Sequence, residues 1–74
     1  MSYNFTKHKT ANFTVAVDRA ANYGYFEHDE YGDECGGGLW FESKALVDYD
    51  GVGELDTEVI DKLAELGYDV SEVA

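Results

Sequence analysis

Helical periodicity confined to one short segment is the feature that most limits what this chain can fold into. Apolar residues recur there at the i, i+3, i+4, i+7 spacing of an amphipathic helix, namely at Val59, Ile60, Leu63 and Leu66. The spacing predicts a helix over 57–66. The rest of the 74-residue chain is expected to consist of strands, turns and loops.

The residues at both ends of this segment are typical of helix boundaries. Asp56 is a suitable N-cap, and Leu55 and Ile60 flank it at the spacing of a hydrophobic staple. Gly67 stands where a left-handed C-terminal cap is expected, and Tyr68 can fold back on the last turn. These boundaries make the helix the best-defined element that the sequence predicts.

The segments before the helix show the two-residue alternation of strands. Residues 13–18 and 23–28 are rich in β-branched and aromatic types and predict two strands. Residues 39–42 and 45–49 predict two more, joined by a tight turn at Ser43-Lys44. Short connections of this kind favour antiparallel pairing.

Two segments give weaker signals. Residues 1–10 are polar and predict either an edge strand or a loosely held arm. Residues 29–38 contain four acids and three consecutive glycines, a composition that predicts a loop. Within that loop, Gly36-Gly37-Gly38 is expected to act as a flexible hinge, because no basic residue follows it to make a phosphate-binding motif.

The order of elements predicts a single α+β domain over residues 1–74, with a small antiparallel sheet of three to four strands and one C-terminal α-helix packed on one face. The alternation within the strands predicts that one set of side chains faces the helix, namely Phe26, Leu39, Phe41, Val47 and Tyr49. The set predicted to face away from the helix consists of Tyr25, Glu27, Trp40, Glu42, Leu46 and Asp48. This outward set is either an exposed binding face or is covered by the N-terminal segment, and a shift of one residue would invert it.

The net charge is large and unevenly distributed. Sixteen acidic residues face five basic ones, giving a formal net charge of −11. Residues 1–26 contain three basic residues and one acid, a net charge of +2, whereas residues 27–74 contain fifteen acids and two lysines, a net charge of −13. Such a charge favours a soluble monomer but strains the compact state by self-repulsion. It also opposes direct nucleic-acid binding, which depends on neutralising phosphates with Lys and Arg.

Catalytic and metal-binding patterns are weak. Cys35 follows the carboxylate of Glu34, which disfavours the thiolate that a nucleophile needs. Counting Gly51 as the sixth residue of a calcium loop places Leu46 and Thr57 at the first and twelfth positions, where acidic ligands are required. We therefore predict a non-enzymatic protein with no metal and no cofactor. A single cysteine and the lack of a continuous apolar run predict a cytoplasmic location.

Carboxylates in two segments are the candidate partner-binding groups. Alternate strand residues stand about 6.5–7 Å apart and helix neighbours about 5–6 Å apart, spacings similar to those of phosphates. An acidic surface of this kind can occupy a groove of Arg and Lys that otherwise binds DNA. The predicted binding residues are Glu27, Asp29, Glu30, Asp33, Glu34, Glu54, Glu58, Asp61 and Glu65. Tyr25 and Trp40 are secondary candidates, for an adaptor that binds through an aromatic sheet face.

The acidic run from His28 to Glu34, the acidic segment from Glu54 to Glu65 and the connecting sequence 46–52 (LVDYDGV) resemble small inhibitors encoded by phages and mobile elements. Among these, anti-CRISPR proteins that act on type I surveillance complexes are the most similar, including inhibitors of the type I-C system. The resemblance is one of type and rests on no diagnostic motif. It implies a protein that binds the complex in the host cytoplasm and blocks target-DNA or PAM recognition by mimicking duplex DNA. The alternative is an anti-restriction factor or an inhibitor of another host DNA-binding protein.

Overall fold

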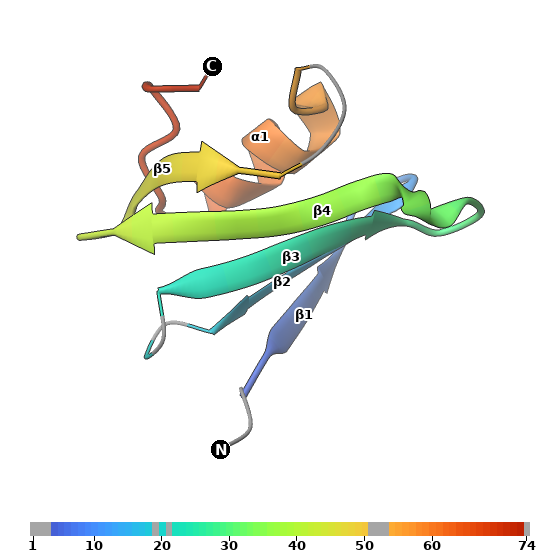
Figure 1. Ribbon diagram of the computed structural model, residues 1–74, viewed down its shortest axis with the longest axis horizontal. Coiled ribbons are helices and arrows are strands. Elements are labelled where there is room, and N and C mark those ends of the chain that lie inside the picture. Colours follow the sequence, from blue (N-terminus) through green and yellow to red (C-terminus); the bar gives the residue numbers. More distant parts are fainter. Residues whose placement is uncertain (1–3, 19, 21, 51–53, 74) are drawn as a thin grey trace.

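The computed structural model describes residues 4–18, 20, 22–50 and 54–73, except for the side chain of Asp33 (Figure 1). Gly51 and Val52, which belong to the connecting sequence discussed above, lie outside these residues. The elements in chain order are β1 (Thr6–Lys9), β2 (Phe13–Asp18), β3 (Tyr23–His28), β4 (Gly32–Glu42), β5 (Ala45–Tyr49) and α1 (Thr57–Glu65).

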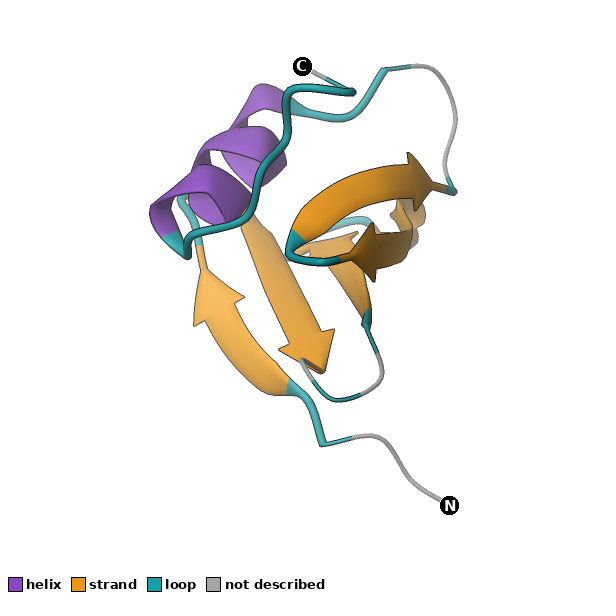
Figure 2. Ribbon diagram, turned by 90° about the vertical axis from the view of Figure 1, so that its left-hand side faces the viewer, coloured by secondary structure: helices purple, strands orange, loops and turns teal. Residues whose placement is uncertain are grey.

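The strands form one antiparallel meander in the order β1-β2-β3-β4-β5, so each strand pairs with its neighbour in the sequence. The helix lies across one face of this sheet (Figure 2). The α+β class with one C-terminal helix is therefore confirmed. The sheet has five strands where three to four are predicted, because residues 6–9 form the edge strand β1 and pair with β2.

The helix follows its sequence prediction closely. It ends at Glu65, one residue earlier than predicted, and the side chain of Asp56 accepts a hydrogen bond from the Glu58 backbone N–H at 2.9 Å. Gly67 adopts a left-handed φ of 96° after the last turn. The Tyr68 backbone N–H then returns to the Leu63 carbonyl at 3.0 Å, as in a helix C-cap.

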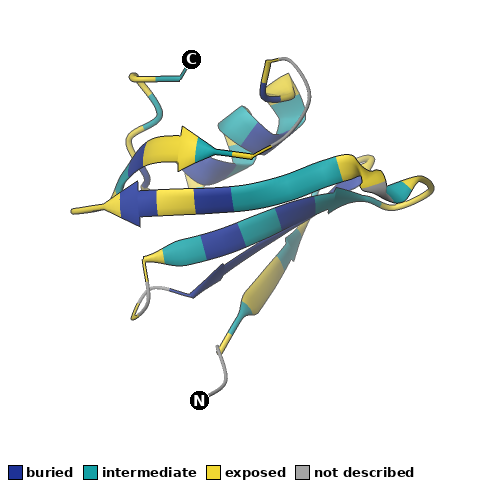
Figure 3. Cartoon of the chain, in the orientation of Figure 1, coloured by how far each residue is buried: buried dark blue, intermediate teal, exposed yellow. Residues whose placement is uncertain are grey.

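The core lies between the helix and the sheet (Figure 3). Alternate residues of β2 point toward the helix, so the β-branched and aromatic side chains of this strand are packed away from water. The same face receives side chains from the other central strands and from the helix. The buried hydrophobic cluster consists of Phe13, Val15, Val17, Phe26, Leu39, Phe41, Leu46, Leu55, Val59, Leu63 and Tyr68.

The loop predicted over residues 29–38 is wrong, because β4 begins at Gly32 and runs through the three glycines. Gly37 pairs with Phe26 and Gly38 with Tyr25. The glycines permit this pairing where β4 approaches β3 closely. A Cβ on Gly36 would lie 2.4 Å from the Phe26 carbonyl oxygen. Only a residue without a side chain fits there, so the predicted hinge is instead a part of the sheet.

The predicted facing of Leu46 and Val47 is also wrong. The register shifts between Trp40, which pairs with Asp48, and Phe41, which pairs with Leu46. This irregularity leaves an extra residue in β5 and turns Leu46 into the core, where its exposed fraction is 0%. Val47 is 41% exposed. The tight turn before β5 is confirmed, with positive φ values of 52° at Ser43 and 65° at Lys44.

Candidate partner-binding groove

A groove of about 620 Å³ opens between the turn that joins β3 to β4 and the start of α1. We call it the acidic groove. Its lining includes aromatic rings from β2, β3 and the β3–β4 turn, which we call the aromatic wall. It also includes carboxylates from β4 and from the residues around the helix N-terminus, which we call the acidic wall.

The aromatic wall is a continuous row of rings. The Phe26 and Phe13 ring centroids lie 6.3 Å apart, Phe13 and His28 lie 5.0 Å apart, and His28 and Tyr31 lie 4.7 Å apart. The row leads from the core to the surface, since Phe26 is buried and Tyr31 is 56% exposed. The acidic groove therefore has an apolar floor and an accessible phenol ring at its mouth.

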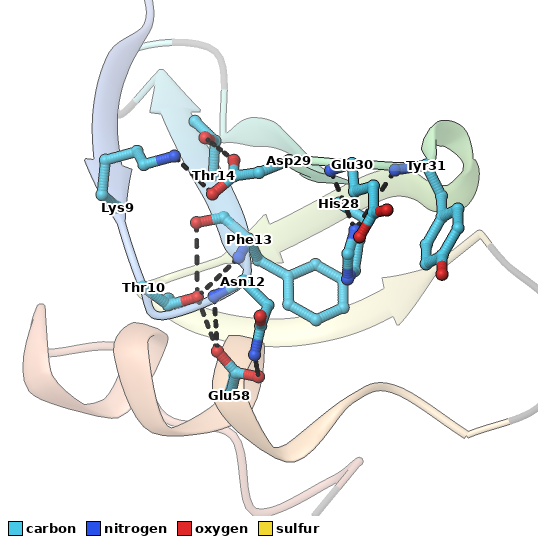
Figure 4. Close-up of polar contacts among 10 residues, drawn as sticks. All are labelled: Lys9, Thr10, Asn12, Phe13, Thr14, His28, Asp29, Glu30, Tyr31 and Glu58. Atoms are coloured by element: carbon cyan, nitrogen blue, oxygen red, sulfur yellow. Dashed lines mark hydrogen bonds and ion pairs between the residues drawn. The ribbon is translucent and has the colours of Figure 1, made fainter.

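His28 fixes the turn that carries this outer ring. Its Nδ1 accepts hydrogen bonds from the backbone N–H groups of Glu30 at 3.0 Å and Tyr31 at 3.2 Å (Figure 4). A ring nitrogen that accepts hydrogen bonds carries no proton, so Nδ1 acts here as an acceptor only. The His28 ring thus ties the backbone of the turn and supports the ring of Tyr31.

Glu58 is the most firmly held carboxylate on the acidic wall. Its Oε1 accepts hydrogen bonds from the Thr10 hydroxyl and the Asn12 backbone N–H, each at 3.0 Å, and its Oε2 accepts one from Asn12 Nδ2 at 2.9 Å (Figure 4). The Asn12 side-chain amide, followed by the Asn12 backbone N–H and the Thr10 hydroxyl, lowers the pKa of Glu58 against desolvation, which raises it. Glu58 therefore joins the helix to the β1–β2 turn.

Glu34 and Glu54 are the two carboxylates of the acidic groove that have no partner among the described residues. Both are exposed, and neither side chain makes a hydrogen bond or ion pair with any residue that the structure describes. They come from segments twenty residues apart in the chain, one on β4 and one just before α1. The fold thus brings together acids from both predicted segments, and leaves two of them free to bind.

Two further predicted carboxylates already have partners outside the groove. Asp29 accepts a hydrogen bond from the Thr14 hydroxyl at 2.9 Å and forms an ion pair with Lys9. The hydrogen bond from Lys9, followed by that from Thr14, lowers the pKa of Asp29. Glu65 forms an ion pair with Lys62 at 3.2 Å.

The remaining predicted acids are dispersed. Glu27 is half-buried on β3, opposite Thr14, while Glu30 and Asp61 are exposed at separate positions that do not line the groove. The side chain of Asp33 lies outside what the structure describes. Of the eight predicted acids whose side chains the structure describes, Glu34, Glu54 and Glu58 line the groove and the other five do not.

The sheet face away from the helix carries the aromatic candidates. Phe5 packs edge-on against Tyr25, with ring centroids 4.9 Å apart, so the N-terminal segment covers part of this face. Tyr23 lies 5.5 Å from Trp40, which is 39% exposed. The face is therefore partly covered and partly exposed, so each of the two alternatives predicted for it holds in part: Tyr25 is half-buried, and Trp40, beside Tyr23, remains accessible.

Sequence reasoning missed the aromatic wall of the groove. An aromatic residue at Tyr31, within an otherwise acidic turn, is the one local signal that could have indicated it. The contact of Glu58 with Asn12 has no such signal, because it joins residues 46 apart in the chain.

Two results limit other interpretations of the described residues. No group of three or more His, Cys, Asp or Glu side chains among them is placed to hold a metal ion. Within the same residues, no helix is long and apolar enough to cross a bilayer. Comparisons with protein-family models, curated proteins and solved structures give no match to this chain.

Proposed function

We propose that this protein is a non-enzymatic inhibitor that docks through its acidic surface onto the basic, DNA-binding surface of a host protein complex. The observation that carries the proposal is that Glu34 and Glu54 line the same groove, both exposed and both without a partner among the described residues. Carboxylates left free beside an apolar floor favour a cationic partner. The net charge of −11 draws such a partner from a distance.

The target that we propose is a type I CRISPR surveillance complex, with type I-C as the first to test. The support for this target is the resemblance of the acidic segments to small anti-CRISPR proteins. In this proposal a monomer acts in the host cytoplasm and occupies the surface that engages target DNA or the PAM. It competes with DNA and does not bind DNA itself, because its charge repels phosphates.

A competition assay tests the proposal. Purified type I-C surveillance complex is mixed with a fluorescent PAM-containing duplex, and DNA binding is followed by anisotropy as the protein is added. We expect DNA to be displaced, with weaker displacement as salt rises. The charge reversals Glu34→Lys and Glu54→Lys should reduce displacement far more than the matched pair Glu42→Lys and Glu72→Lys, whose positions are exposed outside the groove.

Each outcome of this assay is informative. Equal losses from the two pairs of variants would show that total charge matters and that the groove does not. DNA binding that persists at saturating protein would reject this complex as the target. Inhibition that is unchanged at high salt and in both pairs of variants would reject the electrostatic mechanism.

A second candidate function is a protein–protein adaptor or an inhibitor of another host DNA-binding protein. The observation that favours it is the accessible ring of Trp40, which lies beside Tyr23 on the sheet face away from the helix. Under this alternative, Trp40→Ala would abolish capture of the partner while the charge reversals in the groove would have little effect. The same four charge variants and Trp40→Ala therefore separate the two functions in one experiment.

A further inference from the structure

We infer that the acidic groove is a receptor for an arginine side chain that a basic partner protein presents. The inference deepens the proposed function and rests on it only in taking the partner to be a basic protein. It names the group that is recognised and the residues that recognise it. These are Tyr31 on the aromatic wall, with Glu34 and Glu54 as the acceptors.

The two walls differ in the way that a guanidinium group requires. A guanidinium is planar and stacks on an aromatic face, while its edge donates paired hydrogen bonds to carboxylates. Tyr31 offers an exposed ring, and the contact with His28 and the hydrogen bonds to its Nδ1 hold that ring in place. The carboxylates of Glu34 and Glu54 line the same groove.

Among the described carboxylates that line the groove, Glu34 and Glu54 are the two without a hydrogen-bond or ion-pair partner. Glu58 uses both of its oxygens for Thr10 and Asn12, and Asp56 caps the helix. Among the described residues, no lysine or arginine lines the groove. A cationic partner can supply the positive charge that Glu34 and Glu54 lack, and the five N–H donors of an arginine match two carboxylates.

The floor of the groove suits the rest of the side chain. Phe13 and Leu55, each 6% exposed, line it below the carboxylates. The three methylene groups of an arginine can cover such a surface while the charged head stays at the rim. A lysine could use the floor and the charge, but its compact ammonium group lacks the planar face that stacks on Tyr31. The groove should therefore prefer arginine over lysine.

A peptide titration tests the inference without any partner protein. The ¹⁵N-labelled protein is titrated in about 0.1 M salt, where the Debye length is about 10 Å, with the capped peptide acetyl-Gly-Arg-Gly-amide, and in parallel with acetyl-Gly-Lys-Gly-amide. We expect the arginine peptide to shift amide signals of the groove residues selectively. It should bind about fivefold more tightly than the lysine peptide, because of ring stacking. Tyr31→Ser should remove this preference and leave weaker binding of both peptides.

Matched charge variants locate the site. Glu34→Gln with Glu54→Gln should weaken the arginine peptide about tenfold, the loss expected from removing its charge-assisted hydrogen bonds. Glu42→Gln with Glu72→Gln removes the same charge elsewhere and should weaken it by less than about twofold, since exposed distant charges are screened. All four positions are exposed, and the dispersion of the amide spectrum verifies that each variant is folded.

Several results would overturn the inference. These are equal affinity for the two peptides, shifts spread over the whole acidic surface, equal losses in the two pairs of variants, and no response to millimolar peptide. Arginine binding that persists while the surveillance complex is not inhibited would reject the proposed target and leave the receptor intact. Inhibition without arginine selectivity would reject the receptor and keep the target.

Discussion

Substituting alanine for Gly36 and, separately, for Gly38 distinguishes a paired strand from a flexible hinge. In a hinge, Gly→Ala restricts the unfolded chain and stabilises a protein by about 0.4–1 kcal/mol. The structure predicts a different outcome, because both glycines lie in β4. The two positions also differ from each other in what the new methyl group would meet.

At Gly36 the obstacle is backbone. A Cβ there would lie 2.4 Å from the Phe26 carbonyl oxygen and 3.0 Å from the Glu27 Cα, neither of which can move without disturbing β3. Overpacking of this kind costs about 1–3 kcal/mol. After the gain from the unfolded chain is subtracted, we expect a net loss of about 1–2 kcal/mol. A 74-residue domain has about 4–11 kcal/mol of total stability, so the loss is substantial.

At Gly38 the obstacle is a side chain that can move. The Cβ would lie 2.8 Å from Cη2 of Trp40, the outer end of a ring that is 39% exposed. Rotation of the ring relieves this contact, so the free energy of unfolding should change by less than about 0.5 kcal/mol, the range of surface substitutions. The ring itself moves into water, and the fluorescence emission of the folded protein should shift to longer wavelength.

Urea denaturation followed by tryptophan fluorescence measures both effects, since Trp40 is the only tryptophan. With a slope of about 1 kcal/mol per molar urea for so small a domain, Gly36→Ala should lower the midpoint by about 1–2 M. Gly38→Ala should leave the midpoint nearly unchanged and shift the emission. If Gly36→Ala leaves the midpoint unchanged or raises it, the pairing of this part of β4 with β3 is refuted.

Three further predictions concern stability. The pKa of Glu58 is lowered in the folded state, so its contribution to the free energy of unfolding is complete above its ordinary pKa of 4.5 and is lost as the pH falls through the folded value. Thermal unfolding should show the wild type more stable than Glu58→Gln at pH 7, and this difference should disappear in acid. A difference that stays constant with pH would contradict the prediction. Leu63→Ala should lower the free energy of unfolding in urea by about 2–5 kcal/mol, because Leu63 is fully buried and its removal leaves a cavity. A loss below about 1 kcal/mol would place Leu63 outside the core. Gly67→Ala should cost about 1–2 kcal/mol because φ is 96° there, and Gly67→Asn should cost less; equal stability of the two variants would argue against the left-handed cap.

The helix and three of the strands could be predicted because their signals are local. Asp56 and Gly67 lie only eleven residues apart, and they set the helix boundaries together with the apolar spacing between them. The pairing of β4 was not predictable in this way. Three glycines carry no alternation, and what requires a glycine at position 36 is the backbone of Phe26 in the neighbouring strand. The bulge that turns Leu46 inward likewise depends on how β5 meets Trp40.

The candidate site shows the same division. Composition alone identified an acidic surface, and Glu34 and Glu54 were among the nine predicted residues. The sequence could not show that Asp29 is neutralised by Lys9 or that Glu58 is bound to Asn12. These partners lie 20 and 46 residues away in the chain. Which carboxylates remain free is therefore a property of the tertiary structure.

The bond between Glu58 and the β1–β2 turn also bears on the order of folding. Each strand pairs with its sequence neighbour, so the sheet can form by successive hairpins with little loss of chain entropy, whereas the bonds from Thr10 and Asn12 to Glu58 close loops of 48 and 46 residues. Docking of α1 is then a late step. The acidic groove exists only after this step, since part of its lining, including Glu34, belongs to the sheet and part, including Glu54, belongs to the segment that docks with α1. A bound partner would hold these two parts together and so slow the undocking of α1, which is the first step of unfolding. The protein should therefore unfold more slowly in the complex than alone.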